Sequence, residues 1–139
     1  MEEDKIFLLC SDGSENSNRA ARYLSEMASC LQGRVTLLHV LSNEEAVAMG
    51  DGLKSDDLPP SLEKRLIPAM DALDSQDIDY SVSVQIGDPE SVILEMSSRY
   101  EAIVMGYKGV NERRIAELLM GSVADHVLRH TKKPVILVP

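Results

Sequence analysis

Short apolar runs alternate with segments of helical periodicity along the chain, and this alternation constrains the fold more than any other feature. The runs lie at residues 5–10, 34–41, 80–86, 102–105 and 134–138. Between them, apolar residues recur every three or four positions, the spacing of one helix face. Parallel strands need such long crossovers, and strands covered on both faces are continuously apolar. The order predicts an α/β fold: a doubly wound, Rossmann-like, five-stranded parallel sheet with helices on both faces, a three-layer α/β/α sandwich made by residues 1–139 as a single domain.

Four local patterns before residue 100 predict two helices, an acidic loop and an edge strand. Ser14 is expected to cap a first helix that carries Ala20, Leu24 and Leu31, and Gly33 to stop it. Residues 43–60 hold five acidic residues and two glycines, so we expect a mobile acidic loop there. Pro68 falls within the next helical pattern and is expected to kink that helix or delay its start. Residues 80–86 alternate with period two, which is typical of an edge strand.

A glycine-rich stretch follows the apolar run at residues 102–105. Gly106 ends that run, Gly109 follows, and Gly121-Ser122 open an amphipathic segment that predicts a helix to about His130. Three apolar residues of that helix are expected to face inward: Val123, Val127 and Leu128. A helix N-terminus offers free N–H groups and a partial positive charge to an anion. The stretch therefore predicts an anion cradle, most often for phosphate, and it lies beside Asp12 if the two strands are neighbours.

Charge and cysteine content exclude several classes of protein. The net charge of −9 argues against duplex nucleic acid as a partner. No apolar run approaches the roughly 18 residues of a membrane span, and the first residues are acidic where a signal peptide would be basic. Cys10 and Cys30 are interpreted as reduced core thiols, which favours a cytoplasmic protein. Residues 106–133 carry six basic against three acidic residues, either as a solvated surface or as a field for a small polyanion.

Several catalytic patterns are incomplete. Asp12-Gly13-Ser14 resembles part of a phosphotransferase motif, but Cys10 stands where that motif has its nucleophilic aspartate. No Walker sequence with Gly-Lys-Ser or Gly-Lys-Thr is present. His126 and His130 are four residues apart on one helix, a spacing compatible with a metal, yet a surface pair is favoured because no third ligand is evident. No residue set names a substrate to be transformed, so the chain is not expected to be an enzyme.

The motifs together resemble the universal stress protein family over almost the whole chain. The pieces that carry the resemblance are Asp12-Gly13-Ser14, Leu38-His39-Val40, Gly87-Asp88-Pro89, residues 103–109, residues 121–130 and residues 133–138. The resemblance implies a homodimer with the last strand, Val135–Val138, at the interface. An exposed apolar edge strand of that kind also invites pairing on physical grounds.

The resemblance further implies a site for ATP, with or without Mg²⁺. In the nucleotide-binding branch the motif is G-x2-G-x9-G-[ST], which Gly106, Gly109 and Gly121-Ser122 match. The implied nucleotide-binding residues are Ser11, Asp12, Val40, Met105, Gly106, Gly109, Gly121, Ser122 and Val123. In this mapping, Asp12 bonds the ribose or the adenine edge, and Val40 and Met105 flank the base. A plain turn-forming role for Asp12 stays open, as does a plain core role for the two apolar residues.

The spacing inside the glycine motif departs from the family pattern. Eleven residues separate Gly109 from Gly121 where the pattern has nine. The excess could bulge outward, with Asn111 capping a short helix over residues 112–119, or it could close the pocket. Lys108, Arg113 and Arg114 are candidates for the γ-phosphate. Three functions follow: an ATP-binding regulatory homodimer, a nucleotide-free dimerisation and signalling module, and a slow ATP hydrolase or phosphotransferase.

Overall fold

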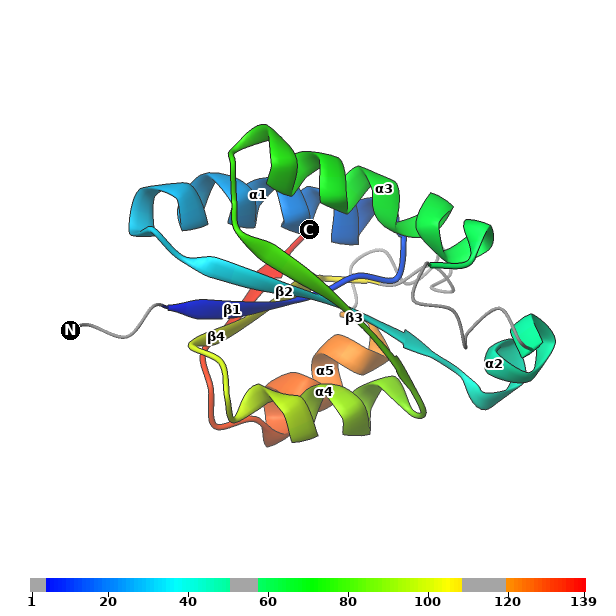
Figure 1. Ribbon diagram of the computed structural model, residues 1–139. Coiled ribbons are helices and arrows are strands. Elements are labelled where there is room, and N and C mark those ends of the chain that lie inside the picture. Colours follow the sequence, from blue (N-terminus) through cyan, green and yellow to red (C-terminus); the bar gives the residue numbers. More distant parts are fainter. Residues whose placement is uncertain (1–4, 51–57, 109–119) are drawn as a thin grey trace.

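The computed structural model describes residues 5–50, 58–108 and 120–139, which form alternating strands and helices (Figure 1). The elements follow the predicted order, with the short helix α2 added after the second strand. Their bounds are β1 Ile6–Cys10, α1 Glu15–Leu31, β2 Arg34–Leu41, α2 Asn43–Met49, α3 Pro60–Ser75, β3 Tyr80–Ile86, α4 Pro89–Ser97, β4 Ala102–Gly106, α5 Ser122–His130 and β5 Val135–Val138.

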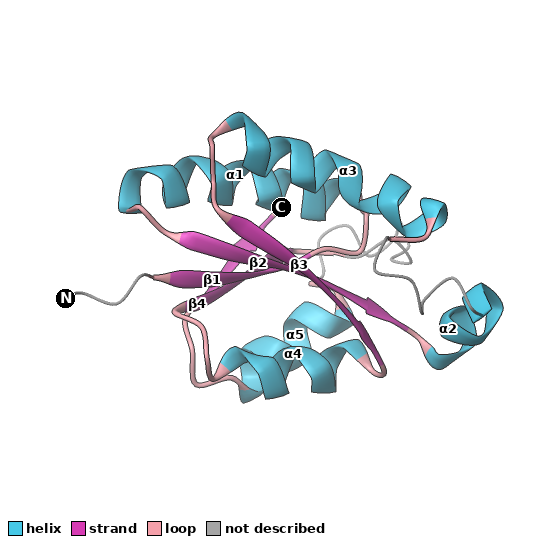
Figure 2. Ribbon diagram, in the orientation of Figure 1, coloured by secondary structure: helices cyan, strands magenta, loops and turns pink. Residues whose placement is uncertain are grey.

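The five strands form one parallel sheet in the order β3-β2-β1-β4-β5. Helices α1 and α3 cover one face and α4 and α5 the other, which makes three layers (Figure 2). The chain winds outward from β1 to β3 and then returns to β4 on the other side of β1. This confirms the predicted doubly wound α/β fold. The winding reverses between β1 and β4, and such reversals leave a crevice at the carboxyl ends of the strands.

The central strand β1 is buried on both faces. Leu9 packs in the core under α1 and α3, whereas Leu8 packs in the core against α4 and α5, and neither is exposed to solvent. Each buried leucine contributes about 1.5–3 kcal/mol relative to an exposed one. Two cores on opposite faces of the strand explain why its sequence is continuously apolar rather than alternating.

Residues 43–49 form helix α2, so the prediction of one acidic loop over residues 43–60 was wrong for this part. The hydroxyl Oγ of Ser42 accepts the N–H of Glu45 at 3.1 Å, and the Glu45 carboxylate accepts the N–H of Ser42 at 3.3 Å. This reciprocal capping box satisfies two N–H groups at the start of the helix. The remainder of that prediction falls partly on residues 51–57, which lie outside the described residues.

Helix α3 begins at Pro60 and continues through Pro68, so the predicted delay in its start was wrong. Pro60 fits the first helical turn, where no intrahelical N–H bond is needed. Pro68 costs the helix interior about 3 kcal/mol because it lacks an N–H group. A fully buried stripe of four residues offsets that cost: Leu62, Leu66, Ala69 and Leu73.

Helix α1 ends at Leu31, and the residue that turns the chain there is not the expected Gly33. Gln32, rather than Gly33, adopts the left-handed conformation, with φ of 54°. The N–H of Gly33 then donates to the carbonyl of Ala28 at 2.9 Å. A Cβ on Gly33 would lie 2.7 Å from Cε2 of Phe7, so this glycine makes room for the ring. Leu31, expected on the inward face, is exposed because the helix ends there.

Two predictions about buried side chains are correct only in part. Both cysteines are free thiols, but Cys10 is buried whereas Cys30 is exposed on α1. In α5, Val127 is fully buried and Val123 packs half-buried against the core, but Leu128 is 45% exposed. The strands β3 and β5 form the two edges of the sheet, as predicted, and all four residues of β5 are only half-buried.

Candidate functional site

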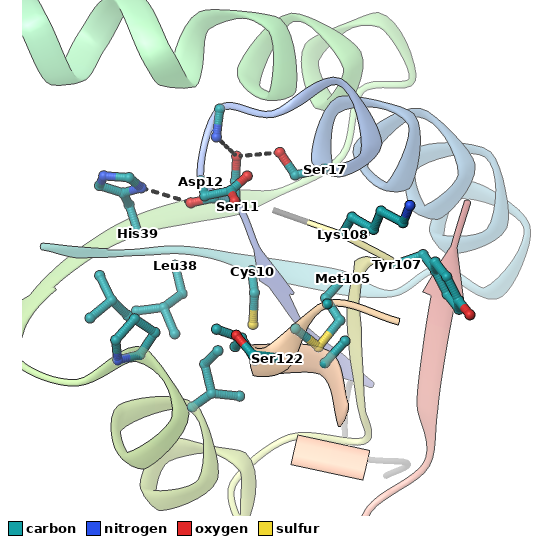
Figure 3. A pocket seen from close by; sticks show the side chains of 18 of the residues that line it. Cys10, Ser11, Asp12, Ser17, Leu38, His39, Met105, Tyr107, Lys108 and Ser122 are labelled. Atoms are coloured by element: carbon teal, nitrogen blue, oxygen red, sulfur yellow. Dashed lines mark hydrogen bonds between the residues drawn. The ribbon is translucent and has the colours of Figure 1, made fainter. Parts of the chain in front are cut away.

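An open cleft of about 580 Å³ lies at the carboxyl ends of β1, β2 and β4 (Figure 3). Its lining residues come from the strand ends, from the loops that follow them, and from helices on both faces of the sheet. They are Cys10, Ser11, Asp12, Gly13, Ser17, Leu38, His39, Val40, Glu45, Arg65, Pro89, Ile93, Met105, Gly106, Tyr107, Lys108, Gly121, Ser122, Val123 and Ala124. Eight of the nine sequence-predicted site residues lie in this set, and the ninth, Gly109, lies outside the described residues.

Pairing of β1 with β4 brings the two predicted loops together. Leu9 of β1 is in register with Val104 of β4, so the loop at Asp12 and the chain leaving Gly106 meet at one edge of the sheet. A Cβ on Gly106 would lie 2.8 Å from the Cβ of Asn16. The glycine is therefore needed for close packing of β4 against the first turn of α1, independently of any ligand.

The N-terminus of α5 opens into the cleft without a side-chain cap. Gly121 is the cap residue, its own N–H donates to the carbonyl of Tyr107 at 2.8 Å, and, having no side chain, it makes no side-chain cap bond to the first turn. By contrast, α1 is capped by Ser14 and α4 by Asp88. The first turn of α5 therefore keeps the partial positive charge of a helix N-terminus at the cleft. Lys108 adds a positive side chain to the same lining.

Asp12 forms the turn that starts α1. Its Oδ1 accepts the N–H of Ser14 at 2.9 Å, and the Oγ of Ser14 accepts the N–H of Ser17 at 3.1 Å. The alternative interpretation of Asp12 as a turn-forming residue is thus confirmed. The carboxylate is exposed at the cleft, so this turn does not prevent a second contact with a ligand.

His39 is a site residue whose importance the sequence did not reveal. Its side chain is 3% exposed, and Nδ1 lies 2.7 Å from the carbonyl oxygen of Ser11. Because a carbonyl oxygen only accepts, Nδ1 is the donor in this contact. Within the described part of the chain, Nε2 is buried and has no partner. The sequence feature that could have indicated its role is its position as a polar residue inside the apolar run at residues 34–41.

The other side of the cleft is apolar. Cys10, Leu38 and Met105 lie across the cleft from Ser11 and His39 (Figure 3). Burial raises the pKa of the Cys10 thiol to about 12, so it stays protonated and is not a nucleophile at neutral pH. Val40 packs half-buried against the same core. Together these side chains make an apolar wall of the kind that contacts an aromatic ring.

Helices α2 and α3 contribute an ion pair that sequence reasoning missed. Nη1 of Arg65 donates to Oε2 of Glu45 at 2.9 Å. This bond, more than any other contact, holds the pKa of Glu45 below its usual 4.5. The two residues are 20 positions apart in separate helices, so no local pattern connects them. The capping-box spacing of Ser42 and Glu45 could have indicated the position of the Glu45 carboxylate, but not its partner Arg65.

The other candidates from the sequence are separate from the cleft or undescribed. The rings of His126 and His130 stack on α5 with centroids 4.2 Å apart, and Nδ1 of His126 lies 3.5 Å from Oε2 of Glu90. Within residues 5–50, 58–108 and 120–139, no three His, Cys, Asp or Glu side chains are grouped so that they could hold a metal. Arg113 and Arg114 lie outside the described residues. No helix in those same ranges is long and apolar enough to cross a membrane.

Comparison with known proteins finds relatives that match almost the whole chain. The curated stress response protein NhaX of Bacillus subtilis is 24% identical, with 97% of each chain covered. A universal stress protein solved in complex with cAMP superposes with a TM-score of 0.73 at 21% identity, over 99% of this chain and 98% of that one. The universal stress protein of Archaeoglobus fulgidus in complex with dAMP gives 0.68 at 22% identity over all of both chains. At these identities the structures establish the shared fold.

The family model supplies the assignment itself. The model of the universal stress protein family matches residues 5–139, nearly the entire chain. The match includes all the elements that form the sheet and the cleft. The protein belongs to the universal stress protein family.

Proposed function

We propose that the protein is an ATP-binding regulatory protein that acts as a homodimer in the cytoplasm. The observation that carries the proposal is the N-terminus of α5, where the cap residue Gly121 has no side chain, beside the apolar residues Cys10 and Met105 of the cleft. That combination suits a ligand that carries both an anionic group and an aromatic ring. Two proteins of the same fold were solved with adenine nucleotides, cAMP and dAMP, which supports an adenine ring.

The roles of the lining residues follow from their positions. The backbone N–H groups of Ser122 and Val123, at the start of α5, receive the phosphates, and Lys108 adds a positive charge there. Ser11 and Asp12 follow β1, the middle strand of the sheet, and therefore lie between the proposed phosphate and base positions, where they contact the ribose. Val40, at the end of β2, contacts the base.

The apolar wall and the glycine pair complete the proposed site. Met105 packs against the base from the end of β4. Gly106 allows the end of β4 to lie close to α1, and Gly121 lets the first turn of α5 approach the phosphates. Gly109 is retained in the proposal as the second glycine of the motif. A Mg²⁺ ion, where it takes part, is held chiefly by the phosphates and water, as is usual for nucleotide-bound magnesium.

A nucleotide-free dimerisation and signalling module is a second candidate, and one observation favours it. Gly106 is required by the contact with Asn16 on α1, so its presence does not by itself indicate a phosphate. The interval from Gly109 to Gly121 is also two residues longer than in the nucleotide-binding pattern.

Ser122→Asp tests the phosphate end of the proposed site. An acidic residue in the first turn stabilises a helix, so α5 keeps its structure, while the added negative charge repels phosphate. Calorimetric titration should give an affinity for MgATP at least about tenfold lower than that of the wild type. Ser61→Asp, in the exposed first turn of α3 and outside the cleft, makes the same charge change and should bind like the wild type. Equal affinities of the Ser122→Asp variant and the wild type would contradict the proposal.

A further inference from the structure

The ion pair between Glu45 and Arg65 lies on the cleft but has no role in the proposed binding of phosphate or ribose. It joins α2 to α3 across the end of β2, and both side chains remain about 40% exposed. Both residues are among those that line the cleft. A charged pair that faces a ligand cavity can form hydrogen bonds with the donor and acceptor groups of the ligand and so select among ligands.

The Glu45 carboxylate is held in one orientation with acceptor capacity left over. Its Oε1 lies 3.3 Å from both N and Oγ of Ser42, and its Oε2 accepts from Arg65 at 2.9 Å. A carboxylate has about four lone-pair sites, so the described contacts occupy three and leave about one, on Oε2. The lowered pKa keeps the group ionised at neutral pH, when it accepts hydrogen bonds and donates none.

The ion pair and the N-terminus of α5 lie on opposite sides of β1. Glu45 follows β2, whereas α5 follows β4, and β1 separates these two strands in the sheet. Neighbouring strands are about 4.8 Å apart, so the two sides of the cleft are separated by roughly 10 Å. A nucleotide whose phosphates lie at α5 therefore directs its base toward β2 and the ion pair.

We propose that Glu45 recognises the exocyclic amine of adenine and that Arg65 holds the carboxylate in place for this contact. The inference rests on the proposed nucleotide site and adds its base selectivity. Adenine presents an N–H donor at position 6, which matches the free acceptor site on Oε2. Hypoxanthine and guanine present a carbonyl oxygen there, which a carboxylate repels. The pair thus makes the cleft select aminopurine over oxopurine nucleotides.

Comparison of ATP with inosine triphosphate isolates this contact. The two ligands have the same ribose and triphosphate, and their bases differ at position 6 and at the adjacent N1, which is an acceptor in adenine and an N–H donor in hypoxanthine. A carboxylate that accepts from N1–H instead of the 6-amine would therefore bind inosine triphosphate more tightly. Calorimetric titration of the full chain with each ligand gives the ratio of their affinities. One charge-assisted hydrogen bond predicts a preference for ATP of about tenfold or more in the wild type. A ratio near one, or tighter binding of inosine triphosphate, would overturn the inference.

Glu45→Gln assigns the preference to this residue. The amide oxygen is expected to keep the bond from the N–H of Ser42, which leaves the NH₂ group toward the base. The affinity ratio should then fall to about one or reverse. Glu44→Gln is the matched control because Glu44 is an exposed neighbour outside the cleft, and it should keep the wild-type ratio. An unchanged ratio in Glu45→Gln would overturn the inference.

The same titrations separate this inference from the proposed function. Binding of ATP and inosine triphosphate with equal affinity would leave the nucleotide site intact and remove only the selectivity assigned to Glu45. Absence of binding of either ligand by the wild-type protein would overturn the proposed function and this inference together.

Discussion

The imidazole Nδ1 of His39 lies 2.7 Å from the carbonyl oxygen of Ser11, and this contact ties the end of β2 to the loop after β1. A second bond, from the N–H of Ser11 to the carbonyl of Leu38 at 2.9 Å, fixes the same loop from its other side. Asp12 follows directly. The neighbouring strand β2 therefore helps to fix the position of this loop, in addition to the bonds that Asp12 and Ser14 make within it.

Replacement of His39 tests this link. His39→Leu removes the donor and leaves the buried carbonyl of Ser11 with one partner fewer, at a cost of about 1–2 kcal/mol in the free energy of unfolding. His39→Asn keeps a donor at the position of Nδ1 and should recover part of that loss. Urea denaturation measures both. Equal stability of the leucine variant and the wild type would contradict a tethering role for His39.

Gly106→Ala tests whether this glycine is needed without a nucleotide. The added Cβ would lie 2.8 Å from the Cβ of Asn16 and 2.9 Å from the backbone N of Ser17, so β4 and α1 must separate. Overpacking of this kind costs about 1–3 kcal/mol. Thermal unfolding of the nucleotide-free protein should give a lower midpoint.

The Glu45–Arg65 pair predicts a pH-dependent contribution to stability. The pKa of Glu45 is lower in the fold than its usual 4.5, so the ionised carboxylate stabilises the folded state. That contribution is fully present above pH 4.5 and is lost as the pH falls through the lowered pKa. Because both side chains are about 40% exposed, Arg65→Gln should cost only a few tenths of a kcal/mol at neutral pH.

Denaturation of wild type and Arg65→Gln at a series of pH values checks the sign. Their difference in the free energy of unfolding should shrink as the solution becomes more acidic than pH 4.5. A difference that grows with acidity would show that the pair does not stabilise the ionised form of Glu45.

The proposed homodimer can be tested at the edge strand β5. The carbonyls of Pro134 and Val138 accept the N–H groups of Ile103 in β4 and of Tyr107 directly after it. The alternate residues Val135 and Leu137 therefore direct their backbone groups to the open edge. Val135→Pro removes one of those outward N–H groups and should produce monomers in sedimentation velocity at micromolar concentration. A wild-type protein that sediments only as a monomer would contradict the proposal.

The opposite edge of the sheet offers a matched control for that experiment. The carbonyl of Asp79 accepts from Val35 of β2, and Gly87 donates to Leu41 of the same strand. Val84, which alternates with these residues, therefore directs its backbone groups away from β2. Val84→Pro makes the same substitution at an edge not assigned to the dimer and should leave the dimer intact.

The sheet and most of its helices could be predicted because their signals are local and repeated. The predicted helix over residues 122–130 coincides with α5, since its apolar positions recur at helical spacing and Gly121 precedes it. Leu128 was nevertheless assigned to the inward face and is 45% exposed. In a helix of nine residues only a narrow stripe, centred on Ala124 and Val127, contacts the core.

Some residues of the candidate site could be predicted from local patterns, and others could not. Ser11, Asp12, Gly106 and Gly121 follow or precede recognisable elements, so a doubly wound topology predicts that they converge. The Glu45–Arg65 pair could not be predicted, because it depends on how α2 and α3 pack in space. His39 was hidden by its neighbours: a histidine in an apolar strand indicates burial, but not which carbonyl it contacts.

The central claim is that the cleft binds an adenine nucleotide, and the most direct test is to extract the purified protein under denaturing conditions. Chromatography of the extract, supported by calorimetric titration with MgATP, measures the nucleotide bound per chain. We predict adenine nucleotide in the extract at close to one per chain, or saturable binding of ATP by the emptied protein. An extract without nucleotide, together with a titration that gives no heat, would contradict the claim and favour the nucleotide-free module.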